Sequence, residues 1–146
     1  MKVSTDNLDI LFLQFHKSIE ETADNVAKTL IKHSSAELIS YPPNGGLTDA
    51  EIESLSSIST DDNMKRGLRK VIANSCARVI FDMLACIDGV REPDLDADKW
   101  KGIKFVDDSD EIEPPDELML YNKLYDSYWT WRKRRDKEWR LDNHSA

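Results

Sequence analysis

The chain has few of the residues that build metal centres or catalytic sites. Its 146 residues include three histidines, His16, His33 and His144, which lie far apart in the sequence. No CxxC, HExxH or ExxH spacing occurs, and the glycine pair at 45 and 46 is not followed by the lysine of a phosphate-binding loop. The sequence therefore predicts no metal and no cofactor, and it favours a protein that is not an enzyme.

Long apolar runs are also missing, and cysteines are few. No stretch approaches the roughly 20 apolar residues that span a bilayer, and the acidic N-terminal stretch does not resemble a signal peptide. Cys76 and Cys86 fall in one expected helix, where ten residues separate them by about 15 Å. A disulfide needs Cα atoms within about 7 Å. Two unpaired thiols suit a reducing compartment, so we expect a cytoplasmic protein.

Negative charge is what the chain has in excess. The formal net charge is -8 and 40% of the residues are hydrophobic, which is typical of a globular domain. We expect a single helical domain over residues 1–146. A negative field disfavours nucleic acid and anionic membranes and favours a basic partner.

Apolar periodicity predicts mainly α structure. Residues 6–33 and 62–88 repeat apolar side chains at helical spacing, with Asp6 or Asn7 as candidate caps of the first helix and Gly89 as the stop of the second. Thr48 and Glu51 have the spacing of a capping box, which predicts a short helix between the two.

The last third of the chain changes character. Residues 91–113 are acidic and irregular, and the alternation at Ile103 and Phe105 suggests a small β-hairpin. Pro114, Pro115 and Asp116 then predict the start of a final helix that runs to about Arg140. The expected fold is a bundle of three long helices and one short helix, with an irregular acidic insertion before the last helix. The expected core comprises Phe12, Phe15, Ile72, Val79, Met83, Leu124 and Tyr128, and the last helix contributes Tyr121, Tyr125 and Trp131.

The acidic insertion is the first candidate for a functional surface. Binding residues tend to lie in irregular segments, and exposed aromatic side chains can anchor a contact that charge complementarity steers. The proposed partner-binding residues are Trp100, Phe105, Asp107, Asp108, Asp110, Glu111 and Glu113. The alternative is that these acids only keep the segment solvated.

Three other candidates are weaker. Asn74, Arg78 and Asp82 form a polar stripe that would either face solvent or line a pocket between the long helices. The stretch from Asp94 to Phe105 resembles the opening of a calcium loop, but Lys99 replaces its glycine and Phe105 its final glutamate. The basic and aromatic end of the last helix is either core or a grip for nucleic acid.

A small acidic protein without a catalytic constellation is similar to the bacterial immunity proteins in size, in charge and in its lack of motifs. That resemblance implies binding and neutralisation of a basic protein. The leading hypothesis is therefore an inhibitor or immunity protein with an acidic binding surface. The second is an enzyme or small-ligand protein with a pocket between the helices, and the third is nucleic-acid binding through the last helix. The sequence leaves the oligomeric state open.

Overall fold

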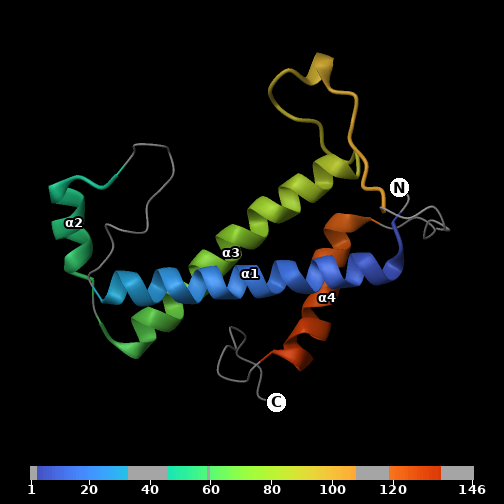
Figure 1. The fold of residues 1–146 in the computed structure, drawn as a ribbon. Coiled ribbons are helices and arrows are strands. Elements are labelled where there is room, and N and C mark those ends of the chain that lie inside the picture. Colours follow the sequence, from blue (N-terminus) through green and yellow to red (C-terminus); the bar gives the residue numbers. More distant parts are fainter. Residues whose placement is uncertain (1–2, 33–45, 59, 108–118, 136–146) are drawn as a thin grey trace. The chain divides into compact units, whose positions relative to one another are not determined.

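The structure is a computed structural model that describes residues 3–32, 46–58, 60–107 and 119–135. Within these ranges the protein is mainly α-helical (Figure 1). Its elements in chain order are α1 (Thr5–Ile31), α2 (Asp49–Ser56), α3 (Asp62–Ile87), a 3₁₀ turn η2 (Ala97–Lys99) and α4 (Leu120–Arg134). Three long helices and one short one fit the predicted helical bundle.

Local signals place the start of α2 and the end of α3 as predicted. The Glu51 N–H donates to Thr48 Oγ1 at 3.3 Å, and the Thr48 N–H donates to Glu51 Oε2 at 2.7 Å, so the capping box is complete. The Thr48 N–H and the Thr48 hydroxyl, the latter at 3.0 Å, both donate to the Glu51 carboxylate and hold the pKa of Glu51 below its usual range. Gly89 adopts φ +71° and ends α3, with the Val90 N–H donating to the Ala85 carbonyl at 3.0 Å.

Three local predictions need correction. Ser4, rather than Asp6 or Asn7, caps α1, because the Asn7 N–H donates to Ser4 Oγ at 3.2 Å. Met119 is extended, so α4 begins at Leu120 instead of Asp116, and the extended Arg135 ends it before Arg140. Residues 103–107 form no strand, and the second half of the predicted hairpin lies outside the described residues.

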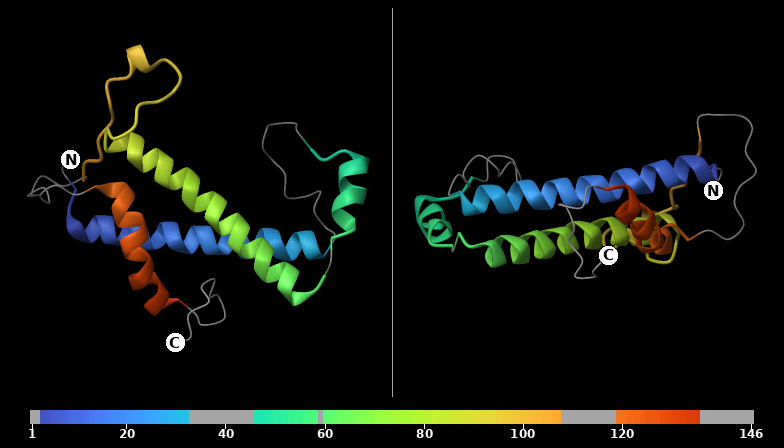
Figure 2. Two further views of the ribbon diagram at one scale, coloured as in Figure 1. Left: turned by 180° about the vertical axis from the view of Figure 1, so that it is seen from behind. Right: turned by 90° about the horizontal axis from the view of Figure 1, so that it is seen from below.

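The described residues gather in two compact units that share the two long helices. The first, which we call the core unit, contains residues 5–18 of α1, 76–87 of α3, the segment after α3 and α4. The second, the alanine unit, contains residues 19–31 of α1, all of α2 and residues 62–75 of α3. Figure 2 shows these helices from two further sides.

The core unit holds most of the large buried apolar side chains. Phe12 contacts the edge of the Phe15 ring, with the ring centroids 5.5 Å apart. Phe81 of α3 contacts Tyr121 of α4 in the same manner at 5.3 Å, so rings from two helices meet at the edge of this core. The buried cluster consists of Val3, Leu8, Phe12, Leu84, Leu120 and Leu124.

The predicted core was partly wrong. Phe12 and Leu124 are buried, and Phe15, Ile72 and Tyr128 are half-buried. Val79 and Met83 of α3 are exposed at 59% and 60%, and so is Tyr125 of α4. The predicted apolar arc of α3 was wider than the arc that neighbouring elements cover, and periodicity alone does not show which part of a wide arc is covered.

Candidate functional site

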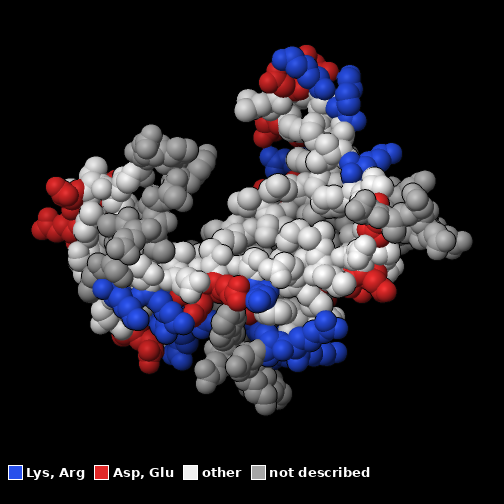
Figure 3. All heavy atoms as spheres, viewed as in Figure 1, with Lys and Arg blue, Asp and Glu red and all other residues white. Residues whose placement is uncertain are grey.

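The segment between α3 and residue 107 leaves the end of α3 as an open loop with η2 at its far end (Figures 1 and 2). We call residues 88–107 the anchored loop, because both of its ends are hydrogen-bonded to the helices of the core unit. Six acidic and four basic residues occur in it. Figure 3 shows both kinds of side chain interspersed over its surface.

The first end of the anchored loop is held by Asp88. Its Oδ2 accepts a hydrogen bond from the Tyr121 N–H at 3.1 Å, and this contact supplies the cap that Met119 does not provide at the start of α4. Burial raises the pKa of Asp88, while hydrogen bonds from the Tyr121 and Leu120 backbones oppose that rise. Asp88 therefore fixes the exit from α3 against the beginning of α4.

The other end is held by Asp107 in a similar way. Its Oδ2 accepts a hydrogen bond from the Ser4 N–H at 2.9 Å, directly before α1. This hydrogen bond lowers the pKa of Asp107, because it stabilises the carboxylate form. The two carboxylates at the ends of the loop thus each bind the N-terminus of a different helix, where the helix dipole also favours negative charge.

Further contacts secure the base of the loop. Phe105 is half-buried and packs against the core cluster. Arg91 lies 3.3 Å from Asp82 Oδ1 of α3 and 3.2 Å from Asp94 Oδ2 within the loop. These contacts join the loop to α3 as well as to α1 and α4.

Beyond its base, the loop turns through two left-handed residues and exposes apolar side chains. Asp96 has φ 54° at the start of η2, and Gly102 has φ +79°. Leu95 is 84% exposed and Ile103 is 52% exposed. Val90 and Val106 are also exposed, so apolar groups in water alternate with charges along a loop whose ends are fixed.

The structure describes three of the seven predicted partner-binding residues. Trp100 is half-buried within the loop, while Phe105 and Asp107 contribute to its anchorage. Asp108, Asp110, Glu111 and Glu113 follow directly and lie outside the described residues. Sequence reasoning did not single out the exposed apolar residues Leu95, Val90 and Val106. For Leu95 a signal was available, because it is an apolar residue isolated among acids in DLDAD.

The polar stripe of α3 lies on an exposed face. Asn74 and Arg78 are exposed, and Arg78 Nε lies 3.9 Å from Asp82 Oδ2, one turn further along the helix. Asp82 also contacts Arg91 of the anchored loop, so its carboxylate takes part in fixing the loop.

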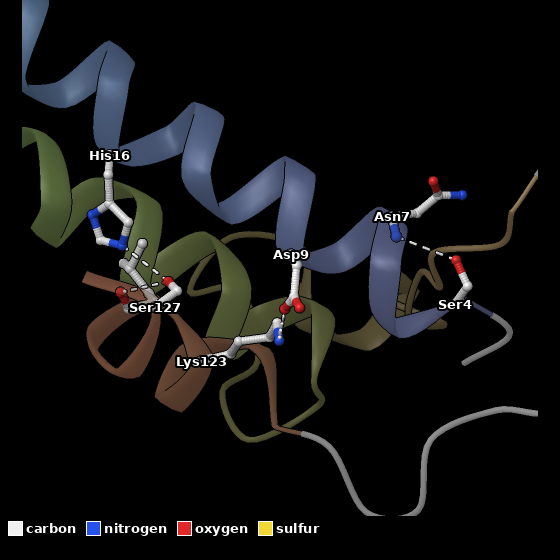
Figure 4. A network of polar contacts seen from close by, with 7 residues as sticks. Ser4, Asn7, Asp9, His16, Lys123 and Ser127 are labelled. Carbon is white, nitrogen blue, oxygen red and sulfur yellow. Dashed lines mark hydrogen bonds and ion pairs between the residues drawn. The ribbon is translucent and has the colours of Figure 1, made fainter. Parts of the chain in front are cut away.

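A buried serine–histidine contact joins α1 to α4 (Figure 4). His16 Nε2 lies 2.9 Å from Ser127 Oγ, and the Ser127 hydroxyl donates to the Leu124 carbonyl at 3.2 Å. The pKa of His16 is lowered to about 4, mainly by burial and also by the nearby positive charge of Arg135, while a hydrogen bond with the Leu124 backbone opposes the shift. The Ser127 hydroxyl thus lies within hydrogen-bond distance of both the imidazole and a backbone carbonyl, and the contact ties α4 to α1.

Candidate metal ligands do not converge within the described ranges. No group of three or more His, Cys, Asp or Glu side chains there is placed to hold a metal ion. In the calcium-like stretch, Asp94 pairs with Arg91 and Asp96 with Lys99. Cys76 and Cys86 are both free, as predicted. None of the helices in the described part of the chain has the length and apolar character needed to cross a membrane.

Comparison of the chain with protein-family models, with curated proteins and with solved structures finds no match in any of the three. The geometry of the site therefore carries the functional argument.

Proposed function

We propose that this is a protein-binding protein that engages a basic partner through the anchored loop and the acidic residues that follow it. The observation that carries the proposal is the exposure of Leu95 and Ile103 on a loop whose ends are tied to two helices. A loop held at both ends loses less conformational entropy when it binds than a free loop would, and exposed apolar groups supply the contact area.

The charge distribution supports a basic partner. The anchored loop is close to balanced, but residues 108–118 add six acids and no base. The negative electrostatic field of these acids raises the association rate with a basic protein and makes that rate depend on salt. Within this proposal the chain acts as an inhibitor or immunity protein in the cytoplasm, and Trp100 lies at the edge of the contact.

A pocket between the helices has less support. Arg78 and Asp82 face the surface and pair with each other and with Arg91. His16 and Ser127 are committed to joining α1 and α4. These observations favour a binding protein over an enzyme or a small-ligand carrier.

A selection from a displayed library of short random peptides tests the proposal. We expect basic peptides to be enriched, and the double variant Leu95→Ser, Ile103→Ser to bind them at least about 10-fold more weakly, because exposed apolar contacts of this kind carry interface affinity. The matched control replaces two exposed valines of α3, Val71→Ser and Val79→Ser, and should leave affinity unchanged.

A charge variant separates steering from folding. Neutralising Asp108, Asp110, Glu111 and Glu113 to Asn or Gln should slow association and weaken its salt dependence, with little effect on the melting temperature. Asp107 is left intact because its carboxylate accepts the hydrogen bond from the Ser4 N–H, directly before α1. If the loop variant and the charge variant both bind the basic peptides as the wild type does, the proposal is wrong.

A further inference from the structure

The second half of α4 presents a surface of a different kind from the anchored loop. Tyr125 is 55% exposed and Trp129 is 52% exposed, and they lie one turn apart on one face of the helix. Arg132 and Lys133 follow at the next turn of the same face. We call Tyr125, Trp129, Arg132 and Lys133 the α4 face.

Neighbouring contacts hold the aromatic groups of this face in place. The rings of Tyr125 and Phe81 have centroids 5.6 Å apart, so α3 supports Tyr125 from beneath. Trp129 contacts the edge of the Tyr128 ring at 5.4 Å, and the Arg132 guanidinium lies 5.9 Å from the Trp129 ring centroid. Tryptophan, tyrosine and arginine are the residue types most enriched among those that dominate protein interfaces, and all three occur on this face.

Asp126 lies beside Tyr125 on α4, but the charge at the C-terminal end of the helix is positive. Residues 127–135 contain four basic residues and no acid. Figure 3 shows basic side chains gathered over this end of α4. Arg135 is buried against Tyr128, but Lys133 and Arg134 are exposed, and neither forms an ion pair with another residue that the structure describes.

We propose that the α4 face is a second docking surface, which binds an acidic, apolar-containing segment of a protein partner. Aromatic rings one turn apart can contact the apolar side chains of an amphipathic segment. The cations beside the rings can pair with the carboxylates of that segment, and arginine can donate two hydrogen bonds to one carboxylate. The chain then carries two surfaces of opposite charge preference, and the α4 face does not depend on the function proposed for the anchored loop.

Charge and number favour a peptide over single-stranded nucleic acid as the occupant. Affinity for nucleic acid grows with the number of phosphates that are neutralised, and three cations at the end of α4 neutralise few. The net charge of -8 on the whole chain also opposes a polyanion. A short acidic segment carries only a few negative charges, which the cations at the end of α4 are numerous enough to pair.

The same displayed library of random peptides tests this inference. We expect a class of peptides with net negative charge and at least one large apolar residue. Trp129→Ala should weaken their binding at least about 10-fold. The variant Arg132→Gln, Lys133→Gln, Arg134→Gln should slow their association and remove most of its salt dependence. Circular dichroism on both variants checks that the helices remain.

The matched control is Trp100→Ala, which removes the same side chain from the anchored loop and should leave the acidic peptides bound as before. Enrichment of basic peptides alone, or acidic peptides that bind Trp129→Ala and the wild type equally, would overturn the inference. So would a thymidine oligonucleotide that binds through Trp129 when acidic peptides do not. A further outcome separates the two proposals. If the library yields acidic peptides whose binding requires Trp129 but yields no basic peptides, the inference about the α4 face is supported and the function proposed for the anchored loop is wrong.

Discussion

The core unit and the alanine unit are built from the two halves of the same long helices, yet they bury different kinds of side chain. In the core unit, α1 buries Leu8 and Phe12 completely. In the alanine unit, the same helix buries Ile19 and the small residues Ala23 and Ala27, beside the charged residues Glu20 and Asp24. Apolar stabilisation scales with the area removed from water, so each buried residue contributes less in the alanine unit.

Ionic contacts occupy part of the buried space in the alanine unit. Arg69 Nε of α3 lies 3.2 Å from Asp24 Oδ1 of α1, and both side chains are 9% exposed. Lys28 also pairs with Asp24 from the next turn of α1. A buried ion pair contributes little net stability, but the loss of one partner is costly, because the other charge stays buried. In the core unit, the size of the buried side chain governs tolerance to substitution. In the alanine unit, the pairing of buried charges governs it.

Phe12→Ala in the core unit should have the largest effect. We expect the free energy of unfolding to fall by about 3–5 kcal/mol, because a buried ring is removed and a cavity remains. Urea denaturation followed by circular dichroism measures the change. Ala23→Gly in the alanine unit is the comparison and should cost only about 1 kcal/mol. Similar losses for the two variants would erase the distinction between the units.

Arg69→Met tests the buried charge of the alanine unit. We expect a loss of about 2–3 kcal/mol, below the usual range for a broken buried pair because Lys28 still contacts Asp24. The double variant Asp24→Leu, Arg69→Met should recover part of this loss in urea denaturation, since neither charge of the buried pair then remains and Lys28 is exposed to solvent. Lys28→Met, at an exposed position, should cost less than about 1 kcal/mol. A double variant less stable than the single one would show that packing, and not charge, dominates there.

The smallest expected effect is the pH dependence that His16 gives to the core unit. Folding lowers its pKa from 6.5 to about 4, so the unfolded state binds the proton first as the pH falls. The stability from neutral His16 is complete above pH 6.5 and is lost as the pH falls towards 4, by on the order of 2 kcal/mol. Unfolding free energies at pH 7 and pH 4.5 should therefore differ less in His16→Gln than in the wild type. An unchanged difference would mean that the groups around His16, namely Ser127, Tyr128 and Arg135, do not disfavour its charged form.

Sequence reasoning located the helices well and the surfaces less well. The capping box at Thr48 and the stop at Gly89 are signals that act within one turn, and both are confirmed. Burial of Val79 and Met83 was predicted from a period that fits several faces of α3 equally, and only the neighbouring elements select one. The exposure of Tyr125 was missed for the same reason, because aromatic residues at helical spacing are more often core.

The amino-acid sequence by itself determined the helical class, the two long apolar periods, the short capped helix and the negative charge. These properties depend on neighbours within a few residues or on composition alone. Tertiary structure decided how the anchored loop is held. Asp88 caps α4 from 33 residues away, and Asp107 reaches Ser4 across 103 residues. A carboxylate in an acidic stretch looks the same whether it is solvated or bound to a helix N-terminus, since only the folded chain brings the unsatisfied backbone N–H groups to it.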